Sequence, residues 1–179
     1  PQGMAREVRL PWTGGEIGAV ETGVGAQPGD ARVGLLAPAM PNLHSHAFQR
    51  GMAGLAERRG HDAESFWTWR EAMYRLALTM TPDDIEAVAA QLYVEMLEAG
   101  FCSVGEFHYL HHDKDGRPSA DPAETAGRIA AAAQTTGVGL TLLPVFYAHS
   151  GFGGAAPGAD QRRFICDLDL YQRLLESAA

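Results

Sequence analysis

The sequence feature that most constrains the fold is a helix–glycine–strand unit, which occurs twice in succession. In the first unit, Thr81 suits the N-cap of a helix, Pro82 its first position, and Asp84 the third position of a capping box. Apolar residues then recur at helical spacing as far as Gly100, which suits the left-handed position after a helix. The sequence predicts a buried strand directly afterwards, over residues 101–107.

The second unit repeats these signals. Asp121 predicts the N-cap, Pro122 follows it, and Glu124 stands three residues after the cap. Gly137 predicts the end of this helix, and residues 140–146 predict the next strand. Helices and strands that alternate in this way are typical of β/α units around a parallel sheet, in a doubly wound sheet or in a (β/α)8 barrel. We therefore expect an α/β protein.

The remaining segments give weaker signals. Residues 6–10 and 31–37 are predicted to be short strands between glycine-rich turns, and residues 167–177 predict an amphipathic helix. No predicted strand is followed by a Gly-x-Gly-x-x-Gly turn or a Walker-type loop. The sequence therefore disfavours the nucleotide-binding versions of an α/β fold.

Composition excludes several classes of function. The 179 residues are 46% hydrophobic and carry 22 acidic against 14 basic side chains, a formal net charge of −8. An acidic surface repels phosphate backbones and anionic lipids, so we expect neither a nucleic acid nor a membrane partner. Two cysteines are too few for a disulfide framework, which favours a reducing cytoplasm.

The residues most suited to chemistry are His44 and His46. Pro38 and Pro41 keep the backbone before them extended. In an extended chain, residues i and i+2 point to the same face, so two imidazoles with this spacing can converge on one cation. The alternative is a pair of histidines at a strand end that bond to backbone or water.

Longer strings around these residues resemble the amidohydrolase superfamily and, within it, the formimidoylglutamate deiminase family. The resemblance starts at about residue 38 and runs to the C-terminus. It rests on four strings: Pro41-Asn-Leu-His-Ser-His-Ala-Phe-Gln-Arg50, Ser65-Phe-Trp-Thr-Trp-Arg70, Glu106-Phe-His-Tyr-Leu-His-His112 and Tyr147-Ala-His-Ser-Gly-Phe-Gly-Gly154.

This resemblance implies a fold and an activity. Residues 38–179 are expected to form the first three β/α units of a metal-dependent (β/α)8 TIM-type barrel, and residues 1–37 part of a small N-terminal β-sandwich domain. The implied reaction is hydrolysis of the amidine C–N bond of N-formimino-L-glutamate, which yields N-formyl-L-glutamate and ammonia during histidine degradation. The implied cofactor is one divalent metal ion, with zinc as the first expectation.

The resemblance also implies roles for individual residues. His44 and His46 are expected metal ligands, and Gln49, Arg70 and Tyr109 are expected to bind the substrate. Arg70 offers a planar fork that matches a carboxylate, and the implied substrate is a small dicarboxylate. The alternatives are an exposed helix charge for Arg70 and a strand-end tyrosine with its hydroxyl in water for Tyr109.

The family's remaining metal ligands and its acid/base residues have no counterpart in this sequence. We expect the catalytic residues beyond Ala179, because the chain starts at Pro1 and stops directly after a predicted helix. The isolated chain is accordingly expected to be inactive. A homodimer is compatible with the sequence.

Two other functions remain open. One is a different amidohydrolase that deaminates a purine or an aromatic amine, and the other is an inactive barrel fragment. Arg70 and Tyr109 discriminate against the first, since a neutral heterocycle needs no carboxylate clamp. Among the other histidines, His108 and His149 are weaker site candidates, while His111 and His112 are expected to be loop residues.

Overall fold

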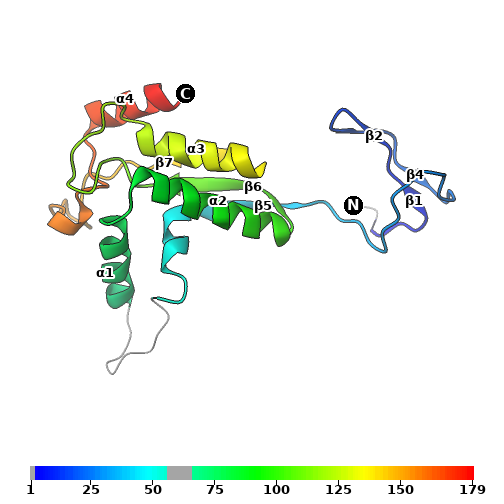
Figure 1. The fold of residues 1–179 in the computed structure, drawn as a ribbon, viewed down its shortest axis with the longest axis horizontal. Helices are drawn as coiled ribbons and strands as arrows, with labels where there is room; N and C mark the ends of the chain where they lie inside the picture. Colours follow the sequence, from blue (N-terminus) through cyan, green and yellow to red (C-terminus); the bar gives the residue numbers. More distant parts are fainter. Residues whose placement is uncertain (1–2, 56–65) are drawn as a thin grey trace. The chain divides into compact units, whose positions relative to one another are not determined.

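The computed structural model describes residues 3–55 and 66–179 (Figure 1). Ser65, which opens one of the four strings, lies outside the described residues. The chain divides into two compact units, and the boundary in the sequence lies between Pro38 and Ala39. Within the described residues, no helix is both long and apolar enough to cross a bilayer.

The first unit consists of short antiparallel pairs. Strand β1 (Val8–Arg9) pairs with β4 (Glu21–Thr22), and β2 (Trp12–Thr13) pairs with β3 (Glu16–Ile17). The strand predicted at residues 6–10 is therefore confirmed in part, as β1.

The strand predicted at residues 31–37 is wrong. Its apolar side chains at Val33, Leu35 and Leu36 are exposed, and this segment forms no ladder with any described strand. A strand is stable only when its backbone groups pair with a neighbour and one face is buried. The alternating apolar pattern indicates neither condition by itself.

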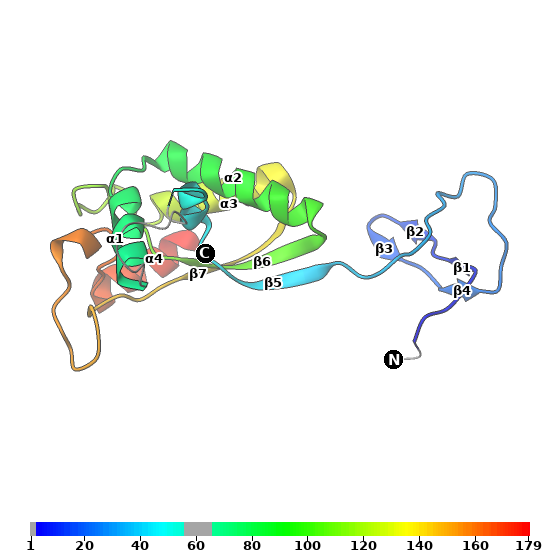
Figure 2. The same ribbon diagram turned by 90° about the horizontal axis from the view of Figure 1, so that it is seen from below.

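The second unit is built on a parallel sheet of three strands in the order β5 (Met40–Ser45), β6 (Phe101–His108) and β7 (Gly139–Pro144). Figure 2 shows α2 (Pro82–Glu98) and α3 (Glu124–Thr136) on the same side of these strands. The expectation of an α/β fold with parallel strands is confirmed.

The first helix–glycine–strand unit forms as predicted. The Thr81 hydroxyl accepts a hydrogen bond from the Asp84 backbone N–H at 3.1 Å, and the Asp84 carboxylate accepts one from the Thr81 N–H at 2.9 Å. This reciprocal capping box starts α2. Gly100 follows the helix with φ of +90°, a conformation that glycine adopts without strain, and the chain enters β6.

The helix of the second helix–glycine–strand unit begins later than predicted. Helix α3 starts at Glu124, and its N-cap is Ala123 rather than Asp121. The Asp121 carboxylate accepts a hydrogen bond from the Ala123 N–H at 2.8 Å, so it closes a turn that precedes the helix. The same carboxylate also accepts from the Ser177 hydroxyl at 2.6 Å, a tertiary contact that no local signal indicates.

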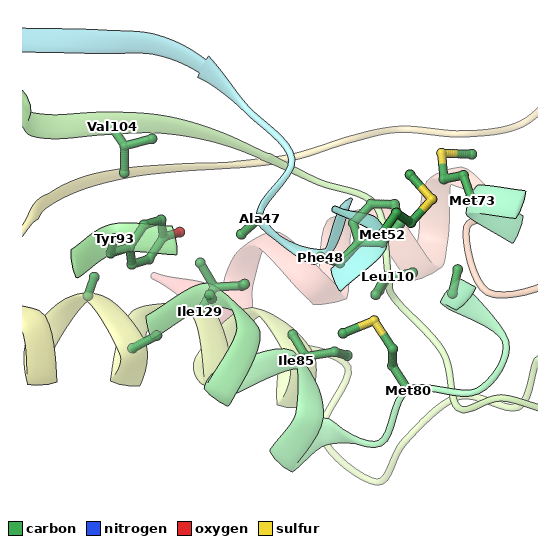
Figure 3. Packing of buried hydrophobic residues seen from close by; sticks show 14 of the residues in the cluster. Ala47, Phe48, Met52, Met73, Met80, Ile85, Tyr93, Val104, Leu110 and Ile129 are labelled. Atoms are coloured by element: carbon green, nitrogen blue, oxygen red, sulfur yellow. The ribbon is translucent and has the colours of Figure 1, made fainter. Parts of the chain in front are cut away.

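The core lies between the sheet and the two helices. Tyr93 of α2, Val104 of β6 and Ile129 of α3 are all buried in it (Figure 3). Cys166 is buried, whereas Cys102 is exposed, because side chains alternate along β6 between the core and the opposite face. Because α2 and α3 cover one face of the sheet, the other face and the strand ends are available for a functional site.

The carboxyl ends of the three strands lie at one edge of the sheet because the strands are parallel. The 3₁₀-helix η1 (Ala47–Met52) follows β5, and α1 (Phe66–Ala77) comes before α2. After β7, the chain passes through the short helix η2 (Ala159–Gln161) to α4 (Leu168–Ala178). Asp167 caps α4 through a hydrogen bond from the Leu170 N–H, which confirms the helix predicted at residues 167–177.

Candidate active site

The two histidines of the His-x-His motif converge at the carboxyl end of β5. Their Nε2 atoms lie 3.0 Å apart, and the ring centroids lie 4.6 Å apart at an interplanar angle of 84°. His46 Nδ1 lies 3.0 Å from the carbonyl oxygen of Phe107 on β6. A carbonyl can only accept, so Nδ1 carries the hydrogen, and Nε2 of the neutral ring presents its lone pair toward His44.

This arrangement fits a metal ion. Two zinc–nitrogen bonds at a tetrahedral angle place their nitrogens about 3.3 Å apart. Burial lowers the pKa of His46, which favours the neutral imidazole that metals bind. The Phe107 carbonyl fixes the orientation of the ring, as partners of metal-binding histidines commonly do. In the described part of the chain, no group of three or more His, Cys, Asp or Glu side chains gathers at one point.

A buried carboxylate supports the start of η1 beside the pair. Glu106 is only 1% exposed, and its carboxylate accepts a hydrogen bond of 2.6 Å from the Ala47 backbone N–H. Burial raises the pKa of Glu106. The sequence interpretation assigned no role to Glu106, although an acidic residue at an inward position of a buried strand is itself a signal.

A cavity of about 340 Å³ opens next to His46. The residues predicted to bind substrate, Gln49, Arg70 and Tyr109, all line it. The other lining residues are mainly aromatic: Phe48, Trp69, Met73, Tyr74, Tyr147 and Phe164. The structure thus brings the predicted metal and substrate residues to one place.

Arg70 is held against the cavity wall by Tyr74. Its Nε donates to the Tyr74 hydroxyl oxygen at 2.7 Å, and its guanidinium lies 5.3 Å from the centroid of that ring. This hydrogen bond raises the pKa of Arg70, so the fixed positive charge persists at all ordinary pH values. Since the two residues are four apart on α1, helical spacing is a signal that could have identified Tyr74 from the sequence.

The other two predicted substrate residues, Gln49 and Tyr109, also lie near His46 in the cavity wall. Gln49 Nε2 donates to Met73 Sδ at 3.3 Å. The Tyr109 ring packs edge-on against His46, with 5.2 Å between their centroids, and burial raises the pKa of Tyr109. Their roles as ligands of substrate remain predictions.

The histidines at the end of β6 and directly after it lie apart from this cavity. His108, His111 and His112 are each at most 5% exposed, and none lines the cavity. Their Nε2 atoms face protein oxygens: Thr125 Oγ1 at 3.1 Å, the Val145 carbonyl at 2.8 Å and the Ile165 carbonyl at 2.6 Å, respectively. His149 is exposed and does not line the cavity either.

Comparisons with known proteins show which class of protein this chain is similar to. No protein-family model matches the chain. A crystal structure of an amidohydrolase from Brucella melitensis matches 97% of the chain with a TM-score of 0.91 and 64% identity. The fold of this chain is therefore that of part of an amidohydrolase.

A curated relative shows which kind of amidohydrolase the chain resembles. The chain is 52% identical over 177 residues to a formimidoylglutamate deiminase from Pseudomonas aeruginosa. The match covers 98% of this chain, which spans 39% of the length of that relative and 39% of the Brucella chain. The resemblance to formimidoylglutamate deiminase predicted from the four strings is confirmed.

Proposed function

We propose that this chain provides part of the active site of a formimidoylglutamate deiminase. The observation that carries the proposal is the convergence of His44 and His46 beside a cavity that contains Arg70. The similarity to a deiminase of that name over nearly the whole chain supports it. In this reaction, water adds to the amidine carbon of N-formimino-L-glutamate, the bond to the terminal nitrogen breaks, and N-formyl-L-glutamate and ammonia leave.

The sheet is proposed to form the first three strands of a (β/α)8 barrel. Three parallel strands in sequential order, with α2 and α3 on one face, are the arrangement with which such a barrel begins. In barrels of this type the site lies at the carboxyl ends of the strands, where His46 and Tyr109 lie. Residues 1–37 are proposed to be part of a small β-sandwich domain.

His44 and His46 are the residues proposed to hold one divalent metal ion, with zinc as the first candidate. When bound, such an ion supplies a water-derived nucleophile at neutral pH. The chain's own contribution is to orient His46 through the Phe107 carbonyl and to shield the cavity from solvent with aromatic side chains. No described residue of this chain is assigned to the proton transfers.

Arg70 is proposed to bind a carboxylate of the substrate. A protein with a net charge of −8 repels a dianion, so binding requires a fixed local cation. The guanidinium fork matches a carboxylate geometrically, and Arg70 is a cavity residue whose charge Tyr74 stabilises.

A second function has one observation in its favour. The aromatic side chains around the cavity suit the stacking of a flat ring, as in a deaminase of a purine or an aromatic amine. The position of Arg70 favours the acidic amidine instead.

The test is ammonia release by the natural polypeptide that carries this chain, with N-formimino-L-glutamate and with aromatic amines as substrates. Replacing Arg70 by Met is expected to lower kcat/KM for the amidine. The expected loss of transition-state stabilisation is on the order of 2–4 kcal/mol. Arg70→Lys should restore only part, because a point charge does not reproduce the fork. Faster turnover of an aromatic amine, or an Arg70→Met variant within about twofold of wild type, contradicts the proposal.

A further inference from the structure

The cavity wall around Arg70 contains a buried amide whose orientation is fixed. Gln161 of η2 is 3% exposed, and its Oε1 accepts a hydrogen bond from the Gly158 backbone N–H at 2.8 Å. Its Nε2 must therefore face the opposite way. There it donates to the hydroxyl oxygens of Tyr74, at 2.8 Å, and Tyr147, at 2.7 Å. Both hydrogens of the amide are used, and both tyrosine oxygens act as acceptors.

These contacts determine where the tyrosine hydrogens go. The Tyr74 oxygen also accepts from Arg70 Nε, so both of its lone pairs are occupied. Tyr147 therefore cannot donate to Tyr74, although Tyr74 can donate to Tyr147. Gln161 Nε2 and Arg70 are donors only and accept from neither hydroxyl. The Tyr147 hydrogen is thus directed out of this cluster and toward the cavity that its side chain lines.

The part of the wall around Arg70 consequently presents two donors. Arg70 contributes a guanidinium, Tyr147 contributes a hydroxyl hydrogen, and no Asp or Glu is among the described residues that line the cavity. Burial raises the pKa of Tyr147 to about 12, so its hydroxyl keeps its hydrogen at neutral pH. A group that accepts from several donors and carries negative charge complements such a wall, and a carboxylate has both properties.

We infer that Tyr147 is a substrate-binding residue that donates to the same carboxylate as Arg70, and that Gln161 is the positioning residue that forces it to donate. This inference rests on the proposed function, since it concerns how the dicarboxylate substrate is held. It assigns a specificity role to Tyr147, which follows β7, and to Gln161 of η2, both far in sequence from Arg70 on α1.

The experiment measures binding separately from hydrolysis. Glutarate, a dicarboxylate, and glutaramide, its neutral diamide, are titrated calorimetrically into the metal-loaded natural polypeptide that carries this chain. Tyr147→Phe removes the hydroxyl and keeps the ring. Gln161→Glu replaces the amide donor with an acceptor that draws the tyrosine hydrogens to itself. Tyr171→Phe is the matched control, because its hydroxyl donates to the Pro144 carbonyl and the residue does not line the cavity.

Both cavity variants are expected to weaken glutarate binding by roughly tenfold or more, the usual effect of losing a hydrogen bond to a charged group. Glutaramide binding should change by less than about twofold, and the control should bind both ligands as wild type does. A variant that merely loosens the wall weakens both ligands equally, so an equal loss overturns the inference, as does an unchanged glutarate affinity. Thermal melting of each variant identifies any that fails to fold, and Tyr147→Phe then decides.

The kinetic arm separates this inference from the proposed function. With N-formimino-L-glutamate, Tyr147→Phe is expected to raise KM by roughly tenfold with a much smaller change in kcat. One outcome is that Tyr147→Phe weakens glutarate binding while the wild-type protein releases no ammonia. This outcome contradicts the proposed function and supports the subsite. Ammonia release that is indifferent to Tyr147→Phe, in KM and in glutarate binding, overturns the subsite and leaves the function standing.

Discussion

Two regions of this protein are rich in histidine, and they differ in what the ring nitrogens face. At the end of β5, the Nε2 atoms of His44 and His46 face each other across 3.0 Å. Over residues 108–112, at the end of β6 and after it, the Nε2 atoms of His108, His111 and His112 each face an oxygen of the protein. In the first region two ring nitrogens converge on one point, and in the second the ring nitrogens bond to oxygens of other segments of the fold.

Burial separates the two regions further. His44 is exposed and His46 is half-buried, whereas the three histidines of residues 108–112 are buried. Burial lowers the pKa of His108 to about 3 and that of His111 to about 4, so both are neutral in the folded protein. The comparison shows that a high density of histidine does not make a metal site. Accessible lone pairs with a common focus are required.

The largest expected effect comes from His44→Ala. Removal of one of two converging nitrogens should reduce bound zinc in the natural polypeptide from near one per chain to near zero, with loss of activity. Elemental analysis of the purified variant is the measurement. His149→Ala, at an exposed histidine outside the cavity, should keep its metal. Unchanged metal content in His44→Ala would remove the distinction between the two regions.

Arg163→Met tests the structural role of the second region. The buried guanidinium donates to the carbonyls of His112, Met80 and Ala77, so three acceptors lose their donor. The expected cost is about 3–5 kcal/mol in the free energy of unfolding. Urea denaturation measures it, and Arg162→Met is the matched control, expected to cost less than about 1 kcal/mol because its hydrogen bonds are exposed. An equal loss in the free energy of unfolding for the two variants would contradict a structural role of the buried Arg163 hydrogen bonds.

Acid should destabilise the protein through the buried histidines. The folded pKa values of His108 and His111, about 3 and about 4, lie below the ordinary value of 6.5. The unfolded chain therefore binds more protons between about pH 4 and 6.5, and the free energy of unfolding falls as pH is lowered through this window. We expect a loss on the order of 2–4 kcal/mol between pH 7 and pH 5.

Glu106 acts in the opposite direction, because burial raises its pKa and its protonation favours the folded state as pH falls. Denaturation curves at several pH values give the slope. His111→Gln should flatten it, and Glu106→Gln should steepen the loss at low pH. A free energy of unfolding that does not change from pH 7 to pH 5 in wild type would show that His108 and His111 are not held neutral.

The smallest expected effect is that of His112→Leu. The variant leaves the Ile165 carbonyl without the donor that now lies 2.6 Å away. Loss of one buried hydrogen bond should cost about 1–2 kcal/mol in the free energy of unfolding. Metal content should not change, which is the contrast with His44→Ala. Zinc lost from His112→Leu at a temperature where the protein is folded would place this histidine in the metal site.

The sequence alone determined the elements whose signals are local. The capping box of Thr81 and Asp84, the glycine after each helix and the apolar spacing of α2 specify their structure within a few adjacent residues. The parallel β/α order and the shared face of His44 and His46 also follow from short-range periodicity. These are the predictions that the structure reproduces.

Only the tertiary structure decided which residues meet. The turn at Asp121 delays α3 because its carboxylate bonds to Ala123 and to Ser177, a residue of another helix. The pattern at 31–37 is not a strand because no described neighbour pairs with it. In both cases the outcome depends on partners distant in sequence.

The same reason explains what the sequence left out of the site. Tyr74, Tyr147 and Gln161 come from three separate segments, and nothing in the residues beside any one of them indicates that it meets the other two. A hydrogen-bond network of this kind exists only after packing brings the segments together. A short motif can therefore specify where two histidine side chains point, while the hydrogen bond that the Tyr147 hydroxyl oxygen accepts comes from a buried amide of η2.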